Sequence, residues 1–504
     1  MAFETGTATN FEDLFGRIVA FVSTNAALVA ANQQWAVLRQ RRDNIGALTS
    51  PLVPQTGGGE RRNILHTCRY DARTLGVDDP LSPNTAAVTC GSLVLGTSFV
   101  RWQLRTASEI ATVRLRAPGV VGVDTMIRSW RLQWSDDGVS WTTALTVANP
   151  PAFTAGEWRD FAVGGSPGAR LHWQIIVDSV QNGSTITVSW SSMLLLRADG
   201  SVANHFGSEV LLEGPGTSGT DEIFVGIRSE YNAVAGWYNL FLNGYTGHNP
   251  SEQSWLSQPG GLPQFGQNPA FGQAMVPCWD QPMPYWIAAN GRSIRFAIKV
   301  STVYEAGYLG FFLPYSTPGQ YPYPLCVGGS LIPQLTARTS DWRFSLIDHR
   351  HSCFPMPGGT TNQDDLTSTF YLRDTSGQWR SFRNRPDSSS GPNSVAGMNA
   401  GQGASFNPIG TSRGMWPHCV YDQWTTGKRP FRECSGGGYL FHPVIPIQRL
   451  PTFEVYGELD GVYIVSGFDN AAENTATFNG DEHVVIANAF RTIPSEYFAL
   501  RLEA

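Results

Sequence analysis

Two histidines separated by one residue form the best candidate metal site in this 504-residue chain. His349 and His351 lie in the segment that runs from Asp348 to Cys353. On a β-strand, residues two apart point to the same side, so both rings could bind one zinc ion with Asp348 or Cys353 as a third ligand. Because the sequence shows no second ligand pair, we favour an exposed polar turn here and expect no bound metal.

The same segment and several carboxylates are the candidates for catalysis. A thiol–imidazole nucleophile built from Cys353 and its neighbouring histidine has no supporting motif. Asp364-Asp365, Glu458 and Asp460 could supply the two carboxylates of a glycoside hydrolase. The sequence contains no internal repeat of the β-helix kind, no Gly-x-Ser-x-Gly elbow, no P-loop and no dinucleotide fingerprint. We therefore expect no catalytic residue, no cofactor and no enzymatic activity.

A further acidic pair ends an alternating strand. Asp136 and Asp137 belong to the stretch 130–141, which reads WRLQWSDDGVSW. These carboxylates either bind a ligand such as calcium or fix a tight turn, because aspartate side chains accept hydrogen bonds from the backbone that follows them. We favour the turn, with Gly138 in the positive-φ conformation that glycine adopts without steric cost.

Composition indicates a turn-rich β protein. Hydrophobic residues make up 41 % of the chain and charged residues only 15 %, against roughly 25 % charged residues in soluble domains. The 53 glycines, 32 prolines and 12 % aromatic residues fit many short strands and turns. A low charge density also suits a surface that neighbours cover in an assembly. The net charge of −6 argues against nucleic-acid binding, and we find no apolar run near the roughly 20 residues that membrane insertion needs.

The seven cysteines are widely spaced and form no Cys-x-x-Cys pair. The N-terminus shows no basic region followed by an apolar segment, so we expect no signal peptide and free thiols in a reducing cytoplasm. A disulfide between Cys68 and Cys90 would form only if the product later met an oxidising exterior.

The elements that position these groups begin with an amphipathic helix. Thr9 to Glu12 fits a capping box in which Thr9 caps the helix and Glu12 reaches back to it. Apolar residues recur at helical spacing from Phe11 to Val22, which predicts a helix that ends near Thr24. The sequence then predicts a short helix over 26–32, a strand over 35–39 and a Pro/Gly linker over 43–60.

Strand-like segments with turn signals between them predict a β-sandwich or jelly roll over about 60–197. The predicted strands are 92–95, 99–104, 112–116, 128–134, 142–147, 157–162, 169–178 and 185–196. Five tryptophans are expected mostly in the core or in strand pairs: Trp130, Trp134, Trp141, Trp158 and Trp173.

This region resembles the discoidin, or coagulation-factor type C, modules of the galactose-binding-like jelly rolls. The resemblance rests on the Ser-x-Asp-Gly hairpin that ends at Trp141, on Gly156-Glu157-Trp158, and on the strand that opens with Ala169-Arg170. In that family, loops at one end of the sandwich bind glycans, lipids or proteins, often beside a structural calcium. The resemblance therefore implies a host-surface glycan as a partner to consider.

The stretch 211–247 rejoins the N-terminal unit after the jelly roll. It predicts strands over 222–227 and 237–242, a loop over 228–236 and a tight turn at Asn243-Gly244. We expect residues 35–39 to pair in one sheet with 211–214 or 222–227, which would make the jelly roll an insertion. The predicted domains are an N-terminal helix and strand unit with linker (1–59), the discoidin-like sandwich (60–200), the continuation of the N-terminal unit (201–250) and a C-terminal β-rich assembly domain (251–504).

The expected fold class is mainly β: an N-terminal helix plus small sheet, an inserted jelly roll, and a loop-rich C-terminal β region. In that last region a turn at Asn290-Gly291 separates two predicted strands. The predicted strands there are 285–289, 293–303, 308–314, 462–466, 482–489 and 496–502.

Segments outside the jelly roll resemble virion structural proteins of tailed bacteriophages, from the tail, baseplate or fibre region. These segments are 11–14, 216–227, 285–292, 299–314, 456–463, 466–468 and 497–500. The resemblance implies a virion component, made in the host cytoplasm, that contacts copies of itself and other tail or baseplate proteins. The alternatives are an adhesin that binds host-surface glycan through the jelly roll and, less favoured, a polysaccharide-degrading enzyme.

Overall fold

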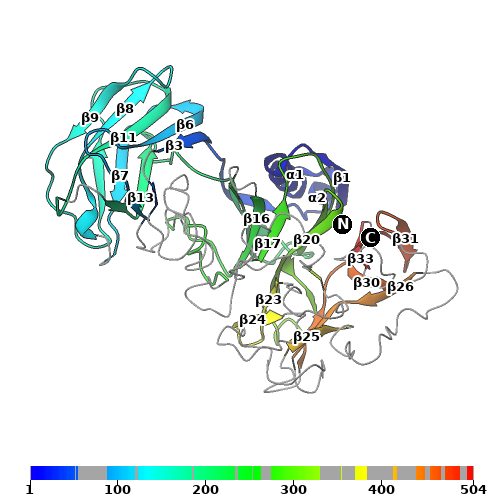
Figure 1. Ribbon diagram of the computed structural model, residues 1–504. Coiled ribbons are helices and arrows are strands. Elements are labelled where there is room, and N and C mark those ends of the chain that lie inside the picture. The colour runs from blue at the N-terminus through cyan, green and yellow to red at the C-terminus, as the bar shows by residue number, and fades with distance from the viewer. Residues whose placement is uncertain are drawn as a thin grey trace, which may run out of the picture. The chain divides into compact units, whose positions relative to one another are not determined.

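The computed structural model describes residues 2–50, 53–54, 88–119, 123–183, 187–232, 237–252, 254–262, 274–329, 353–354, 369–382, 413–416, 439–448, 454–466, 471–487 and 497–502. The chain is mainly β, as predicted, and within these residues α-helix occurs only near the N-terminus. The chain divides into two compact units (Figure 1). Unit 1 comprises residues 1–40, 210–249 and 258–504, and unit 2 comprises residues 41–209 and 250–257.

Unit 1 opens with a strand that the sequence does not predict, β1 (Ala2–Ala8), followed by α1 (Phe11–Thr24) and α2 (Ala26–Ala30). The two predicted helices are confirmed. In the described part of the chain, α1 and α2 together form the one helical stretch that is long and apolar enough to cross a membrane. The apolar composition of α1 is explained by its buried side chains, which are Phe11, Leu14, Phe15, Ile18, Val19, Phe21 and Val22.

The cap of α1 lies one residue later than predicted. Asn10 is the N-cap, and its side-chain oxygen accepts the Asp13 N–H at 2.9 Å. Asp13 in turn accepts the Thr9 N–H at 2.8 Å, while Glu12 accepts the Ser229 hydroxyl at 2.9 Å. The prediction of Thr9 and Glu12 was wrong because asparagine caps helices at least as well as threonine, and Asp13 stands three positions after it.

One sheet of unit 1 joins segments that flank unit 2 in the sequence. Its strand order is β17 (Ala274–Cys278), β16 (Trp237–Tyr245), β15 (Ile223–Asn232), β14 (Glu209–Gly214) and β2 (Ala36–Arg41). The predicted pairing of residues 35–39 with 211–214 is therefore confirmed. Trp35 fixes the start of β2, because its indole N–H donates to the Asn290 carbonyl at 2.8 Å. A Cβ at Gly214 would lie 2.7 Å from the Trp35 ring, so only glycine fits there.

Two predictions within this sheet are wrong. The predicted loop 228–236 is strand over its first part, because β15 continues to Asn232. Asn243-Gly244 lies inside β16 and is no turn. The Asn243 side chain accepts the Leu262 N–H at 3.1 Å, and a Cβ at Gly244 would lie 2.9 Å from the side chains of Leu325 and Val327. Tertiary packing, and not a turn, requires this glycine.

A seven-stranded antiparallel sheet has the order β1, β18 (Met283–Ala289), β19 (Ser293–Val300), β20 (Val303–Phe311), β22 (Leu325–Gly329), β23 (Thr369–Arg373) and β24 (Trp379–Phe382). Side chains on the two faces of this sheet pack into two different hydrophobic cores. Leu309 belongs to a core shared with α1 and the five-stranded sheet, and Tyr308 belongs to a second core. The turn predicted at Asn290-Gly291 connects β18 to β19. β1 pairs with β18, a distant partner for which the local sequence carries no signal.

The second core is shared with a five-stranded sheet near the C-terminus. Its order is β26 (Leu440–Pro443), β30 (Val462–Ser466), β33 (Tyr497–Arg501), β32 (Asp481–Ala487) and β31 (Thr475–Phe478). The predicted strands 462–466, 482–489 and 496–502 are confirmed, with small differences at their ends. Two smaller sheets pair β21 (Leu313–Pro314) with β29 (Gly457–Glu458), and β25 (Arg413–Trp416) with β27 (Ile445–Gln448) and β28 (Glu454–Val455).

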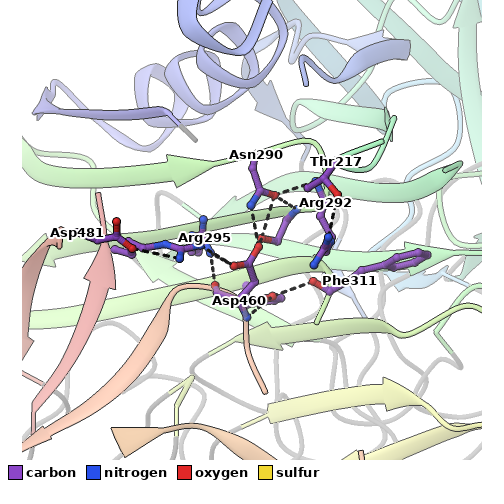
Figure 2. A network of polar contacts seen from close by, with 10 residues as sticks. Thr217, Asn290, Arg292, Arg295, Phe311, Asp460 and Asp481 are labelled. Carbon is purple, nitrogen blue, oxygen red and sulfur yellow. Dashed lines mark hydrogen bonds and ion pairs between the residues drawn. The ribbon is translucent and has the colours of Figure 1, made fainter. Parts of the chain in front are cut away.

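A buried polar network joins the seven-stranded sheet to the C-terminal sheet, with Asp460 at its centre (Figure 2). The Asp460 carboxylate accepts from Asn290 Nδ2 at 2.7 Å and from Arg501 Nη2 at 2.9 Å, and lies 3.6 Å from Arg295 Nη1. Arg295 also donates to the Asp460 carbonyl. Burial alone would raise the pKa of Asp460, but the charges of Arg295 and Arg501 and the Asn290 bond hold it below its usual range.

Replacing Asp460 with alanine should destabilise unit 1 by about 3–5 kcal/mol, because Arg295 would stay buried without its carboxylate. The pH dependence has a definite sign, since the folded-state pKa of Asp460 is depressed. Its contribution to stability is present above the ordinary aspartate pKa of about 4 and is lost as the pH falls through the folded-state value.

Urea unfolding of the wild type and of Asp460→Ala, at neutral pH and then at falling pH, measures both effects. Asp481→Ala is the control, because it removes only a part-exposed 3.4 Å pair with Arg501. Equal unfolding midpoints for Asp460→Ala and the wild type at neutral pH would contradict the prediction.

Unit 2 is a β-sandwich, as predicted. Its five-stranded sheet has the order β3 (Ile45–Thr49), β6 (Phe99–Ser108), β11 (Arg170–Val180), β8 (Ile127–Ser135) and β9 (Thr142–Val147), and Figure 1 draws these strands in blue to green. Two three-stranded sheets are β10 (Trp158–Ala162), β7 (Thr112–Arg116) and β13 (Ser192–Leu196), and β12 (Val188–Trp190), β5 (Val88–Gly91) and β4 (Val53–Pro54). A 3-10 turn, η1 (Val123–Thr125), precedes β8. Side chains such as Trp102, Val113 and Trp190 fill a common core.

The structure corrects the predicted start of the sandwich. The supposed linker 43–60 contains β3, which pairs with β6 from Ile45 opposite Leu104 to Thr49 opposite Arg101. The predicted strand 92–95 is absent, because β5 ends at Gly91 and Ser92 has a φ of 58°. A positive φ interrupts a strand. The composition of this segment suggested a linker, but residues 45–49 form a strand because they pair with β6.

Asp43 ties the first segment of unit 2 to its last. Its carboxylate accepts the N–H groups of Ile45 and Gly207, each at 3.1 Å, and pairs with Arg105 at 3.0 Å. Its own N–H donates to the Ser208 hydroxyl at 3.1 Å. The carboxylate is almost fully buried, so these bonds hold the two segments together where water does not compete.

Asn44 repeats the connection one residue later. Its side-chain nitrogen donates to the Ala203 carbonyl at 2.8 Å, and its side-chain oxygen accepts the Thr106 N–H at 2.7 Å. Its own N–H donates to the His205 carbonyl at 2.9 Å. We call Asp43 and Asn44 the clasp, because together they join β6, the start of unit 2 and its final segment.

Candidate functional site

The hairpin 135–141 is held by side chains that bond to its backbone. Asp137 Oδ1 accepts the N–H groups of Ser140 at 2.7 Å and Val139 at 2.8 Å, and the Ser135 hydroxyl at 2.8 Å. These donors lower the pKa of Asp137 well below its usual range. Gly138 has a φ of 72°, as predicted. Asp137 therefore occupies a turn position in which one carboxylate oxygen is fully engaged.

Asp136 instead pairs with an arginine at the start of β11. Arg170 Nη1 donates to Asp136 Oδ1 at 2.7 Å, and Arg170 Nε donates to the Pro167 carbonyl at 2.8 Å. The guanidinium carbon lies 3.9 Å from the centre of the Trp134 ring. The Asp136 side chain is 68 % exposed and that of Arg170 is 28 % exposed. A rigidly held donor and acceptor thus stand together at the surface.

A pocket of about 700 Å³ lies at the same end of the sandwich. The strand register defines this end, because Arg170 of β11 pairs with Ser108 of β6, and His172 of β11 pairs with Ser135 of β8. We call it the end pocket. Its lining comes from the connections after β6, after β10 and after β13, namely residues 107–111, 163, 165–167 and 197–199.

Arg197 is the fixed cation of the end pocket. Its Nε and Nη2 donate to the Ser108 hydroxyl at 3.3 and 3.1 Å. Its Nη1 donates to the Ser201 hydroxyl and to the Val202 carbonyl, both at 3.1 Å. None of these partners is charged, so they orient the guanidinium without neutralising it.

Two carboxylates line the same pocket. Glu109 is exposed and, among the described residues, its carboxylate has no hydrogen-bond or ion-pair partner. Asp199 Oδ1 accepts the hydroxyl and the N–H of Ser201 at 2.6 and 2.9 Å, which lowers the pKa of Asp199. Glu109, Arg197 and Asp199 are not among the site residues predicted from the sequence, because charged residues in loops carry no local signal of a shared pocket.

Trp173 fixes the rim of the pocket from inside the core. Its ring is fully buried, and its indole N–H donates to the carbonyl groups of Ser108 at 3.2 Å and Arg170 at 3.1 Å. These carbonyls belong to the adjacent ends of β6 and β11. One buried donor therefore sets the spacing of the two strand ends that carry Ser108 and Arg170.

The other candidates from the sequence do not form a described site. His349, His351 and Asp364 lie outside the described residues, so their predicted roles stay untested. Glu458 lies in β29, and the Asp460 carboxylate is held by Asn290 and two arginines. Within the described part of the chain, no group of three His, Cys, Asp or Glu side chains could hold a metal ion.

The described cysteines are buried. Cys90, Cys278, Cys326 and Cys353 are free thiols, and burial raises the pKa of Cys90 to about 12. Cys68, the conditional disulfide partner of Cys90 in the sequence analysis, lies outside the described residues.

The five tryptophans predicted to lie in the core or in strand pairs divide into two groups. Trp130 and Trp173 are fully buried in the core of unit 2. The other three stack beneath arginine side chains: Trp134 beneath Arg170, Trp141 beneath Arg101 and Trp158 beneath Arg116. Trp158 is 37 % exposed. Indole rings outside the core are therefore covered by guanidinium groups, which composition alone does not reveal.

No family model and no curated protein matches this chain. Several solved carbohydrate-binding modules match part of this chain. A Clostridium perfringens module solved with GalNAc-β-1,3-galactose has 13 % identity and a TM-score of 0.22, and the match covers 29 % of this chain and 91 % of that one. The CBM32 of AlyQ, solved with 4,5-unsaturated mannuronic acid, has 14 % identity and a TM-score of 0.21, with coverage of 31 % and 99 %. The family 32 module of C. perfringens NanJ, solved with galactose, has 12 % identity and a TM-score of 0.21, with coverage of 31 % and 97 %.

None of these three matches is a virion protein, so they give no support to the predicted resemblance to tailed-phage proteins.

Trp173→Phe should destabilise unit 2 by about 1–3 kcal/mol more than Trp130→Phe, because two carbonyl groups lose a buried donor. Trp130 is the matched control: its ring is equally buried, but its indole N–H has no hydrogen-bond partner in the described part of the chain. Hydrogen exchange of peptides covering 105–111 and 168–173 in the two full-length variants measures the difference. Equal loss of protection in both variants would refute the assigned role of Trp173.

Proposed function

We propose that this chain is a glycan-binding protein and that the end pocket of unit 2 holds a sugar ring. The observation that carries the proposal is the combination within one pocket of an oriented guanidinium, Arg197, and a carboxylate without a partner among the described residues, Glu109. Ligand sites are typically concave, with a few fixed polar groups that set the orientation of the ligand.

The chemistry of a sugar ring suits this lining. Sugar hydroxyls both donate and accept hydrogen bonds, so one hydroxyl can donate to Glu109 while a neighbouring one accepts from Arg197. Bonds to charged groups are about twice as strong as neutral ones. Val163 and Pro167 are part-exposed and supply apolar surface for the C–H groups of the ring.

The charges of the lining favour a neutral ligand. Glu109 and Asp199 stand against the one cation Arg197. An anionic sugar would meet two carboxylates and a single guanidinium, whereas a neutral sugar uses all three groups through its hydroxyls. We therefore propose a neutral, hydroxyl-rich glycan as the ligand class.

The setting of this activity is also a proposal. We propose a non-enzymatic adhesin carried on a tailed-phage particle, where unit 1 makes contacts with copies of itself and with other tail or baseplate proteins. The resemblance of the segments 216–227, 285–292 and 299–314 to virion proteins is the support for this placement. Host-surface glycan would then be the partner of unit 2.

Glu109→Gln should weaken glycan binding about tenfold, because a charge-assisted hydrogen bond becomes a neutral one. Asp124→Asn is the control: it changes an exposed carboxylate in η1, which precedes β8 and so lies at the opposite end of the sandwich. A glycan array followed by titration calorimetry on the full chain measures binding. If no arrayed glycan binds, or if Glu109→Gln binds as tightly as the wild type, the proposal fails.

Two further assays separate the rival functions. Release of reducing ends from host polysaccharide would assign an enzymatic activity. If the protein neither binds nor hydrolyses glycans and is present in purified particles at a fixed number of copies per particle, a purely structural virion role remains.

A further inference from the structure

We infer that the end pocket is one of two adjacent sugar subsites, and that Arg170 and Asp136 form the second. This inference rests on the proposed function of the end pocket. It adds the ligand class: a disaccharide or longer glycan in preference to a single sugar.

The second subsite is a rigid polar pair. Arg170 is fixed by the Pro167 carbonyl at 2.8 Å, by Asp136 Oδ1 at 2.7 Å and by the face of Trp134 at 3.9 Å. Among the described residues, these contacts leave Arg170 Nη2 and Asp136 Oδ2 without hydrogen-bond partners. Two N–H donors and a carboxylate acceptor therefore lie side by side in fixed positions, which lowers the entropic cost of binding a ligand.

The two subsites share their walls. Pro167 lines the end pocket and accepts the bond from Arg170 Nε. Ser108 also lines the pocket, orients Arg197, and is the β-sheet partner of Arg170. A ring in the end pocket would thus place the next ring of a chain over Arg170 and Asp136.

The exposure of the pair fits a ligand contact better than a structural one. An ion pair whose carboxylate is 68 % exposed adds little to folding stability. The hairpin is already held by Asp137 and Ser135, which bond to its backbone without Asp136. Arg170 Nη2 can instead donate to one hydroxyl of a sugar, while Asp136 Oδ2 accepts from the neighbouring hydroxyl.

The test compares monosaccharides with di- and trisaccharides of galactose, glucose, mannose and N-acetylglucosamine, titrated into the full chain by NMR. The wild type should bind a disaccharide at least about tenfold more tightly than its monosaccharide. Asp136→Asn should remove most of this preference and leave monosaccharide affinity unchanged. Glu109→Gln should weaken both kinds of ligand equally.

Asp160→Asn is the matched control, because it breaks another exposed ion pair of unit 2, Arg114 to Asp160 at 2.6 Å. It should leave the preference intact. If monosaccharide binding depends on Glu109 but affinity does not rise with glycan length, the second subsite alone is overturned. The same holds if the preference for disaccharides survives Asp136→Asn. Absence of binding by every sugar, or binding that ignores Glu109→Gln, overturns the proposed function itself.

Discussion

The structure depends on one geometric constraint: the chain must enter and leave unit 2 at neighbouring positions. β2 and β14 are adjacent strands of one sheet, so residues 41 and 209, which begin and end the main segment of unit 2, lie side by side. Arg41 and Glu209 form an ion pair of 2.7 Å at this point. The clasp then binds the first and last segments to each other through Asp43 and Asn44. The two ends of the segment 41–209 are thereby held together, as an insertion into a loop requires.

The clasp also positions segments that lead to the candidate site. Asn44 binds Thr106 of β6 and Ala203, the two segments that lead to Ser108 and to the loop of Arg197. Trp173 fixes the same strand end from the core. The positions of Ser108, Arg197 and Arg170 therefore follow from buried hydrogen bonds, while the groups available to a ligand stay at the surface. Such support from outside the site is what a preorganised binding site requires.

Buried and exposed ion pairs contribute differently to the stability of this chain. In unit 1, Arg295 and Asp460 are buried. Burial raises the pKa of Asp460, but the charges of two arginines lower it further than burial raises it. Breaking such a pair costs stability because a buried charge is left alone. In unit 2, the pairs Arg170–Asp136 and Arg114–Asp160 are part-exposed and contribute little to folding.

Local patterns in the sequence determined the elements: the apolar spacing of α1, the alternating strands of the sandwich, and the turn at Gly138 with its Asp137 side chain. These features depend on residues close in sequence, so their signals are local. Tertiary structure alone decided the partners: β1 beside β18, β3 beside β6, and Asn243-Gly244 inside a strand because Leu325 and Val327 pack against it. It also decided the end pocket, since Glu109 and Arg197 lie 88 positions apart and only the register of the strands brings their loops to one end of the sandwich.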